Sequence, residues 1–153
     1  MAEYSAVAVQ TVNPGESIIF TDSPVPCERG LVRHRDETGS FLLMGYVPYN
    51  SCGCRNSAAS YLVDFGANIA IPEGGEVEAI SVAIAIDGST IPASTMIVTP
   101  AATEEYWNVS RAINAQIWRG CCETVTVRNT SAQPILVQTA NIIFSRPDLN
   151  VTR

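Results

Sequence analysis

The sequence predicts an all-β protein, a sandwich or barrel built from about ten short strands. Hydrophobic and polar residues alternate along much of the chain, as they do in strands with one buried face. Turn-forming residues interrupt this alternation about every 8–12 residues, the spacing typical of sandwiches and barrels. Of the 153 residues, 46% are hydrophobic and 16% are charged. We therefore expect one domain over residues 1–153, with a full core and a charge-poor surface that a partner covers in part.

In the N-terminal half, alternation predicts four strands separated by turn formers. Asn13-Pro14-Gly15 ends the first strand, and residues 36–39 form a hairpin turn between the last two. The expected strands are 4–11, 17–21, 31–35 and 40–45.

Residues 46–60 break the pattern, because turn formers cluster there and no strand period holds. We expect one long, cysteine-containing loop, and long loops in compact domains are often functional. The side chains expected to make contacts from this exposed loop are Tyr46, Tyr49 and Arg55.

The C-terminal half returns to alternation. Asp87-Gly88 predicts a hairpin turn, residues 100–105 are the one helix candidate, and Pro147 ends the last strand. The expected strands are 61–69, 77–86, 91–99, 106–110, 112–119, 123–129 and 135–145.

Several strand motifs follow one another in a recognisable order. They are Gly15-Glu16-Ser17-Ile18-Ile19-Phe20, Thr38-Gly39-Ser40-Phe41, Val82-Ala83-Ile84-Ala85-Ile86-Asp87-Gly88, Ala115-Gln116-Ile117-Trp118-Arg119-Gly120, Thr124-Val125-Thr126-Val127-Arg128-Asn129 and Ala140-Asn141-Ile142-Ile143-Phe144-Ser145-Arg146. This order resembles the ten-stranded jelly roll of the tumour necrosis factor and complement globular-head superfamily. Within it, the bacterial branch is the nearest: heads of collagen-like spore-surface proteins and similar domains on phage particles. The resemblance covers most of the chain.

The resemblance implies a homotrimer that buries apolar and aromatic residues of its inner sheet along a three-fold axis. The large side chains on late strands are therefore either ordinary core or trimer-interface residues, namely Tyr106, Trp107, Trp118 and Phe144. The chain departs from the related heads in its long loop at 46–60 and in having no collagen-like Gly-X-Y stalk before the head.

The cysteines are compatible with three arrangements. Their spacing is too tight for the usual zinc knuckle, so a metal site would need ligands from separate loops. In the second arrangement the cysteines form one or two structural disulfides, and in the third the thiols are all reduced and buried. The disulfide candidates are Cys27, Cys52, Cys54, Cys121 and Cys122.

No catalytic motif accompanies the one histidine, His34, which we expect at the surface or in an interface. The acidic residues are scattered and form no calcium-loop spacing. We therefore expect no enzymatic activity, no catalytic residue, no metal and no cofactor.

The net charge of −6, with no lysine and no basic cluster beyond Arg29, Arg33 and Arg35, argues against nucleic acid as a partner. No apolar stretch approaches the roughly 20 residues of a membrane span, and the N-terminus has no secretory signal pattern.

Together these observations lead us to expect a structural protein of a bacteriophage particle, made in the host cytoplasm without a signal peptide. It would be a homotrimeric capsid decoration or head-fibre protein on the virion surface, bound to the major capsid protein or another virion component and involved in host attachment, with host glycan as a further partner. The alternative is a receptor- or carbohydrate-binding head of a tail fibre or of a bacterial or spore surface protein.

Overall fold

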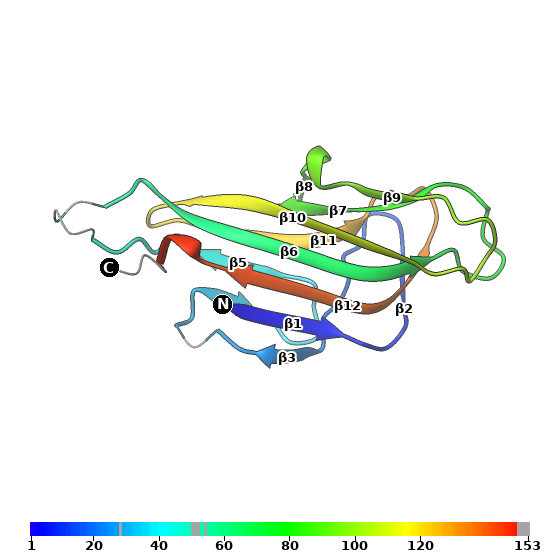
Figure 1. Cartoon of the computed structure of the whole chain (residues 1–153), viewed down its shortest axis with the longest axis horizontal. Helices are drawn as coiled ribbons and strands as arrows, with labels where there is room; N and C mark the ends of the chain where they lie inside the picture. The colour runs from blue at the N-terminus through cyan, green and yellow to red at the C-terminus, as the bar shows by residue number, and fades with distance from the viewer. Residues whose placement is uncertain (28, 50–52, 54, 150–153) are drawn as a thin grey trace.

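The computed structural model describes residues 1–27, 29–49, 53 and 55–149. In that part of the chain, twelve strands form two antiparallel sheets packed face to face, and two single-turn 3₁₀ helices lie outside them (Figure 1). This is the jelly-roll sandwich expected from the sequence.

Sheet A contains the first and last strands side by side, because β1 pairs with β12 from Ala2–Phe144 to Ala6–Ala140. Its strands, in spatial order, are β10 (Trp107–Trp118), β6 (Ala58–Ala70), β12 (Ile135–Ser145), β1 (Ala2–Ala6) and β3 (Asp22–Val25), and β2 (Gln10–Val12) extends β12.

Sheet B is built on β11 and β7, which pair along Val125–Asn129 and Val82–Ile86. Its strands, in spatial order, are β4 (Val32–His34), β5 (Phe41–Met44), β11 (Cys122–Asn129), β7 (Ile80–Ile86) and β8 (Ser89–Thr90), and β9 (Met96–Val98) pairs with the start of β7. The helices are η1 (Pro92–Ser94) and η2 (Pro147–Leu149).

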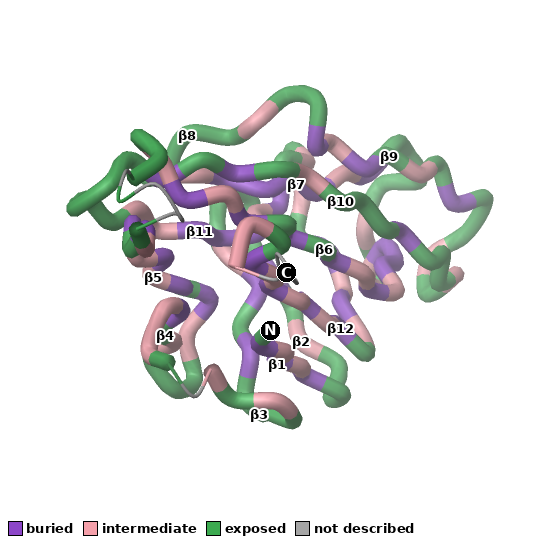
Figure 2. Tube along the Cα trace, turned by 60° about the vertical axis from the view of Figure 1, so that its left-hand side comes forward, coloured by how far each residue is buried: buried purple, intermediate pink, exposed green. Residues whose placement is uncertain are grey.

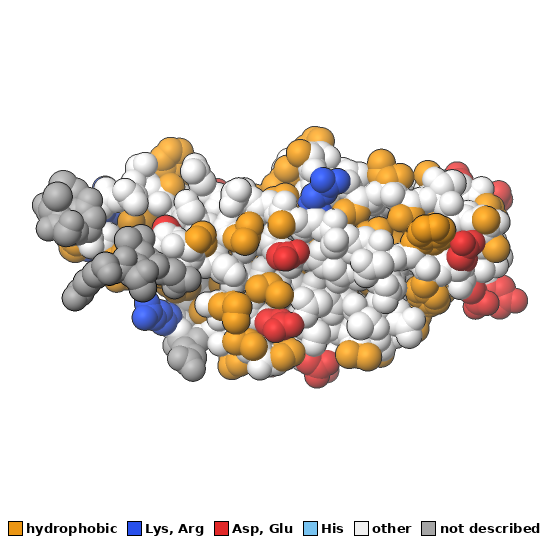
Figure 3. All heavy atoms as spheres, in the orientation of Figure 1, with side chains coloured by type: hydrophobic (Ala, Val, Ile, Leu, Met, Phe, Trp, Pro, Cys, Tyr) orange, Lys and Arg blue, Asp and Glu red, His pale blue; other side chains and the backbone are white. Residues whose placement is uncertain are grey.

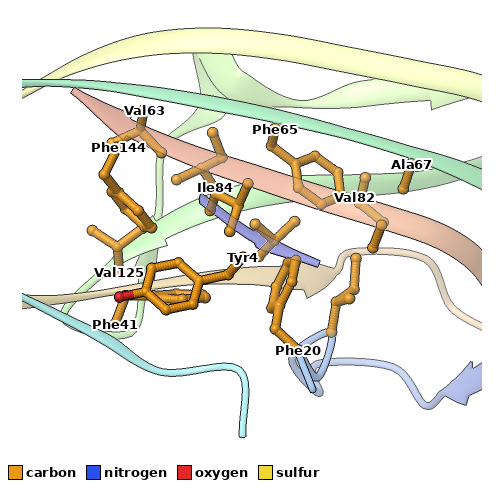
Figure 4. Packing of buried hydrophobic residues seen from close by; sticks show 14 of the residues in the cluster. Tyr4, Phe20, Phe41, Val63, Phe65, Ala67, Val82, Ile84, Val125 and Phe144 are labelled. Carbon is orange, nitrogen blue, oxygen red and sulfur yellow. The ribbon is translucent and has the colours of Figure 1, made fainter. Parts of the chain in front are cut away.

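The core fills the space between the sheets, and buried residues alternate with more exposed ones along β1, β6 and β12 (Figure 2). Phe41 lies at its centre: its ring centroid is 4.9 Å from those of Tyr4 and Phe144 and 5.2 Å from that of Phe20 (Figure 4). The four rings come from both sheets and from the segment before β3, so this aromatic cluster joins the two layers.

Most expected strands are present, but three boundaries differ in the first half. The strand expected at 4–11 is broken at Val7–Val9, which are exposed, and 17–21 makes only isolated bridges through Ser17 and Phe20. The structure instead has β3, which contains Pro24; it lies at the sheet edge, where a missing N–H is tolerated.

The expected loop at 46–60 is shorter and less free than the sequence implied. Residues 58–60 already belong to β6, and Val47 is part of the hydrophobic core. The loop leaves the core only after Val47.

Several differences lie in the second half. The strand expected at 77–86 begins only at Ile80, and the one expected at 91–99 is reduced to β9, because η1 occupies Pro92–Ser94. Residues 106–110 and 112–119 join into the single strand β10. Residues 100–105 form turns rather than a helix. The Glu105 carboxylate accepts hydrogen bonds from the backbone N–H groups of Ala101 and Ala102, and Glu104 has a φ of 59°, which no helical residue adopts.

Candidate functional site

One broad exposed surface is the outward side of sheet A, which we call the A face. Its residues alternate with buried ones along four long or central strands, and most are small or polar. They are Glu3 and Ser5 from β1, Ser60, Leu62, Asp64, Gly66 and Asn68 from β6, Asn108, Ser110, Ala112, Asn114, Gln116 and Trp118 from β10, and Asn141, Ile143 and Ser145 from β12.

The A face has little charge. Among the residues just named, only Glu3 and Asp64 are charged, and both are in register with Ile143, one on each side. The Glu3 carboxylate accepts a hydrogen bond from Asn141 Nδ2 at 2.6 Å. Figure 3 shows this face, where neutral polar side chains and backbone dominate and acidic groups are few.

Apolar groups are interspersed on the same face. Leu62 is 36% exposed and Ile143 is half-buried, while Trp118, at the end of β10, is 61% exposed. Their neighbours Gly66 and Ala112 have no side chain or a very short one, so they project little from the sheet. A second flat surface could therefore approach this sheet closely.

The four aromatic candidates for core or trimer interface do not lie together. Phe144 is core, with 1% exposure. Trp118 and Trp107 stand at opposite ends of β10, roughly 35 Å apart for a strand of this length. Trp107 is 50% exposed and its Nε1 donates to Glu105, and Tyr106 precedes the strand. Of the four, only Trp118 lies on the A face, and the interpretation of Trp118 as subunit core is wrong.

The loop-contact candidates are exposed at one end of the molecule. Tyr46 is 54% and Tyr49 65% exposed, and the Arg55 guanidinium lies 3.8 Å from the centroid of the Tyr49 ring, a cation–π contact. Backbone hydrogen bonds from Gly45 to Cys121 and from Gly120 to Gly45 hold the start of the loop beside the β10–β11 turn.

Arg146 is buried at the same end and connects several segments there by hydrogen bonds, a role that the sequence analysis did not predict. It is 6% exposed; its Nε and Nη2 donate to Asp148 at 2.8 and 2.7 Å, and Nη2 also donates to the Tyr46 carbonyl at 2.9 Å. Its guanidinium carbon lies 4.8 Å from the centroid of the Tyr61 ring. The one available signal was an arginine directly after a strand and two residues before an aspartate.

The pKa values at this end follow from burial and pairing. Burial alone would lower the pKa of Arg146, but the bonds to Asp148 and Tyr61 outweigh it and raise that pKa. Burial would raise the pKa of Asp148, but the hydrogen bonds from Arg146 and the Ser60 N–H lower it on balance. Burial raises the pKa of Tyr61, so the phenol stays protonated, and the carbonyls of Met44 at 2.6 Å and Leu31 at 3.0 Å share its one proton.

The structure describes three of the five cysteines, and these three are free thiols. Cys27 is a half-buried thiol, and Cys121 and Cys122 are exposed thiols, so the interpretation of buried thiols is wrong for the last two. Cys52 and Cys54 lie outside the described residues. Within the described part of the chain, no group of three or more metal-ligating side chains comes together.

His34 is partly buried in the subunit. Its ring stacks on Phe41 at 4.6 Å between centroids, and Nε2 donates to the Thr38 carbonyl at 2.9 Å. It therefore packs against the aromatic cluster.

None of the helices in the described residues is long and apolar enough to cross a membrane.

No protein-family model matches the sequence, and no curated protein matches it. Solved structures do match. The Eiger TNF of S. frugiperda aligns over 95% of this chain and 90% of its own with a TM-score of 0.64 and 11% identity. The globular domain of zebrafish complement 1qA aligns over 93% and 94% with a TM-score of 0.59 and 9% identity.

Murine APRIL at pH 5.0 aligns over 92% of this chain and 97% of its own, with a TM-score of 0.51 and 11% identity. Identities this low establish the fold and nothing finer. The chain has the jelly-roll fold that tumour necrosis factors and complement globular heads share.

Proposed function

We propose that this chain is a non-enzymatic binding head that assembles into a homotrimer through the A face. The observation that carries the proposal is the A face itself, a wide exposed sheet surface with two charged groups among its outward residues. The centres of protein interfaces are depleted of charge in the same way.

The make-up of the A face suits sheet-to-sheet contact. Gly66, Ser110 and Ala112 are short enough to let a second backbone approach, and Leu62 and Ile143 supply apolar area between them. Trp118 adds a large exposed ring at one end of the face, and buried tryptophans often dominate interface energy. That the assembly has three subunits is inferred from the resemblance to trimeric jelly-roll heads.

Assembly through the A face would leave the loop end free. Tyr46, Tyr49 and Arg55 would then form the surface that meets a partner. This supports the second candidate function, a carbohydrate- or receptor-binding head, because exposed aromatic rings beside an arginine suit stacking on a ligand. Tyr49→Ala should then abolish retention on a host glycan preparation without altering the mass of the assembly.

The place on a bacteriophage particle, as capsid decoration or head fibre bound to the major capsid protein, stays a proposal. Quantitative mass spectrometry of purified particles tests it. A decoration protein should occur in many copies per particle, a tail-fibre head in few, and absence from particles would contradict both.

The experiment for the trimer is sedimentation at micromolar concentration. The wild-type chain should give the mass of three chains. Leu62→Glu places a charge on the A face and should give a folded monomer. Ile97→Glu is the matched control, because Ile97 is a 64% exposed aliphatic residue on β9 of the other sheet, and it should leave the trimer intact. A monomeric wild-type chain, or equal effects of both variants, would contradict the proposal.

A further inference from the structure

The symmetry of the proposed trimer requires a second surface on each subunit. In a two-fold dimer the same patch meets itself, but in a three-fold ring one patch of each subunit meets a different patch of the next. The A face therefore needs a partner surface elsewhere on the chain. That surface should complement the two carboxylates that the A face carries, Glu3 and Asp64.

The two carboxylates flank one aliphatic side chain. Glu3 on β1 and Asp64 on β6 are both in register with Ile143 on β12, the strand between them. Their Cα atoms are therefore two strand spacings apart, about 10 Å. Asp64 is exposed and Glu3 is half-buried, and neither forms an ion pair with another described residue. A cation placed over Ile143 would be within reach of both carboxylates.

Arg111 is the one basic residue in the six strands of sheet A. It is exposed on the edge strand β10, where its side chain alternates with those that point to the A face. Its Nη2 donates a long hydrogen bond to the Thr95 carbonyl at 3.4 Å, and no carboxylate in the described part of the chain forms an ion pair with it. The flank formed by β10 and Thr95, which we call the β10 flank, therefore presents an unpaired positive charge.

The strand register places this arginine at the same level along the sheet as the two carboxylates. Asp64 pairs with Ala112, the residue next to Arg111, so the offset along the strand is one residue, about 3.4 Å. The long strands β6, β10 and β12 run along the length of the molecule (Figure 1), so three subunits bury the most surface when these strands follow the three-fold axis. A rotation moves no group along its axis. Arg111 of one subunit and the carboxylates of the next are therefore at matching levels.

We propose that the β10 flank of one subunit packs on the A face of the next, with the Arg111 guanidinium between Glu3 and Asp64 of that neighbouring copy. This inference rests on the proposed trimer and supplies its second surface. The planar guanidinium has five N–H donors, so it can bind two carboxylates at once. Ile97 lies outside the contact, because it alternates with the buried Met96 and faces the outward side of sheet B.

Exchanging the charges tests the contact, with trimer dissociation measured by sedimentation and the fold checked by circular dichroism. Arg111→Glu and Asp64→Arg each bring like charges together and should weaken the trimer at least about tenfold. The double variant Arg111→Glu/Asp64→Arg should assemble at least about threefold more tightly than either single variant. Arg33→Glu is the matched control, because Arg33 is an exposed arginine on β4, an edge strand of sheet B, and it should leave the trimer intact.

Salt gives a readout that a packing defect would not change. Raising sodium chloride from about 0.05 to about 0.5 M should weaken the wild-type trimer, because it screens the charges. Arg111→Gln should reduce this salt dependence, and it replaces Arg111→Glu as the test if the glutamate prevents folding.

The outcomes separate this inference from the proposed trimer. A trimeric wild type that Arg111→Glu does not weaken, or that Arg33→Glu weakens equally, would overturn the inference alone. A double variant that assembles no better than the single variants would do the same. A monomeric wild type would overturn the trimer and this contact together.

Discussion

Arg146 and Asp148, two residues apart, form a bidentate ion pair: Nε and Nη2 of the arginine donate to Oδ1 and Oδ2 of the aspartate at 2.8 and 2.7 Å. The same arginine donates to the Tyr46 carbonyl, and the same carboxylate accepts the Ser60 N–H at 3.3 Å. One pair of side chains thus connects the end of β12, η2, the start of the long loop and the start of β6.

Removing the carboxylate of this pair should destabilise the chain. Asp148→Asn leaves a guanidinium that is 6% exposed without a counter-charge, and breaking a buried pair from one side typically costs about 3–5 kcal/mol. Because Asp148 is partly exposed, we expect the lower end of this range: the unfolding free energy measured in urea should fall by about 3 kcal/mol. Asp22→Asn, an exposed change, is the control. An equally small effect of both variants would show that the pair is not part of the stabilising structure.

The pair should also make stability depend on pH in the acidic range. The pKa of Asp148 lies below its ordinary value of 3.8, so the folded chain binds this proton less readily than the unfolded chain. Its contribution is complete above the ordinary pKa and is lost as the pH falls through the lower pKa of the folded state. Urea unfolding between about pH 6 and about pH 2 should show this loss. The Asp148→Asn variant should have a shallower slope, and parallel curves would contradict the assignment.

Trp118→Ala should weaken trimer assembly but should leave the stability of the folded subunit nearly unchanged. The ring is 61% exposed, so its truncation leaves no core cavity, and we expect less than about 1 kcal/mol of change in dilute solution. Phe41→Ala, by contrast, removes a fully buried ring and should cost about 3–5 kcal/mol. Sedimentation should show that Trp118→Ala lowers the trimer fraction. A loss near that of Phe41→Ala would mean that the ring is packed within the subunit.

The sequence predicted the sandwich because its signals are local: alternating burial in β6 and β12, and the Asp87-Gly88 turn that follows β7. It could not predict where Trp118 faces, since either face of β10 would accept an aromatic ring. Arg146 was missed for a related reason. Its partners Tyr46 and Tyr61 are 100 and 85 residues away in sequence, and only the packed fold brings them together.

Shortening the long loop should have effects that depend on where the cut begins. Deleting residues 50–56 should change the unfolding free energy by less than about 1 kcal/mol, because loop-closure entropy varies slowly with length. Extending the deletion to Val47 removes a core residue that is 3% exposed and also the Tyr46 carbonyl that Arg146 binds. Each kcal/mol of lost unfolding free energy lowers the melting temperature by roughly 2–8 °C. The longer deletion should therefore lower the melting temperature by several degrees. Equal stability of the two deletions would contradict this account.

Gly45 should tolerate no side chain. A Cβ at this position would collide with the backbone carbonyl of Trp118 and would approach that of Cys121 at 2.8 Å, because the loop start passes directly beside the β10–β11 turn. Gly45→Ala should therefore destabilise the chain, whereas a Cβ at Gly53 meets no atom of the described residues within 4 Å and is strained only by the φ of 73°. Thermal unfolding should separate the two variants, with the larger loss at Gly45.

The pairing of Ala2 with Phe144 has a consequence for the order of events during synthesis. β1 lies between β3 and β12 within sheet A, so it cannot be flanked on both sides until β12 (Ile135–Ser145) has been translated. Contacts that span most of a chain slow its folding, because the ends must meet before the pairing stabilises anything. The tyrosine of β1, Tyr4, reaches the ring of Phe144 only once β12 has joined the sheet, so closure of the core depends on strands from opposite ends of the domain.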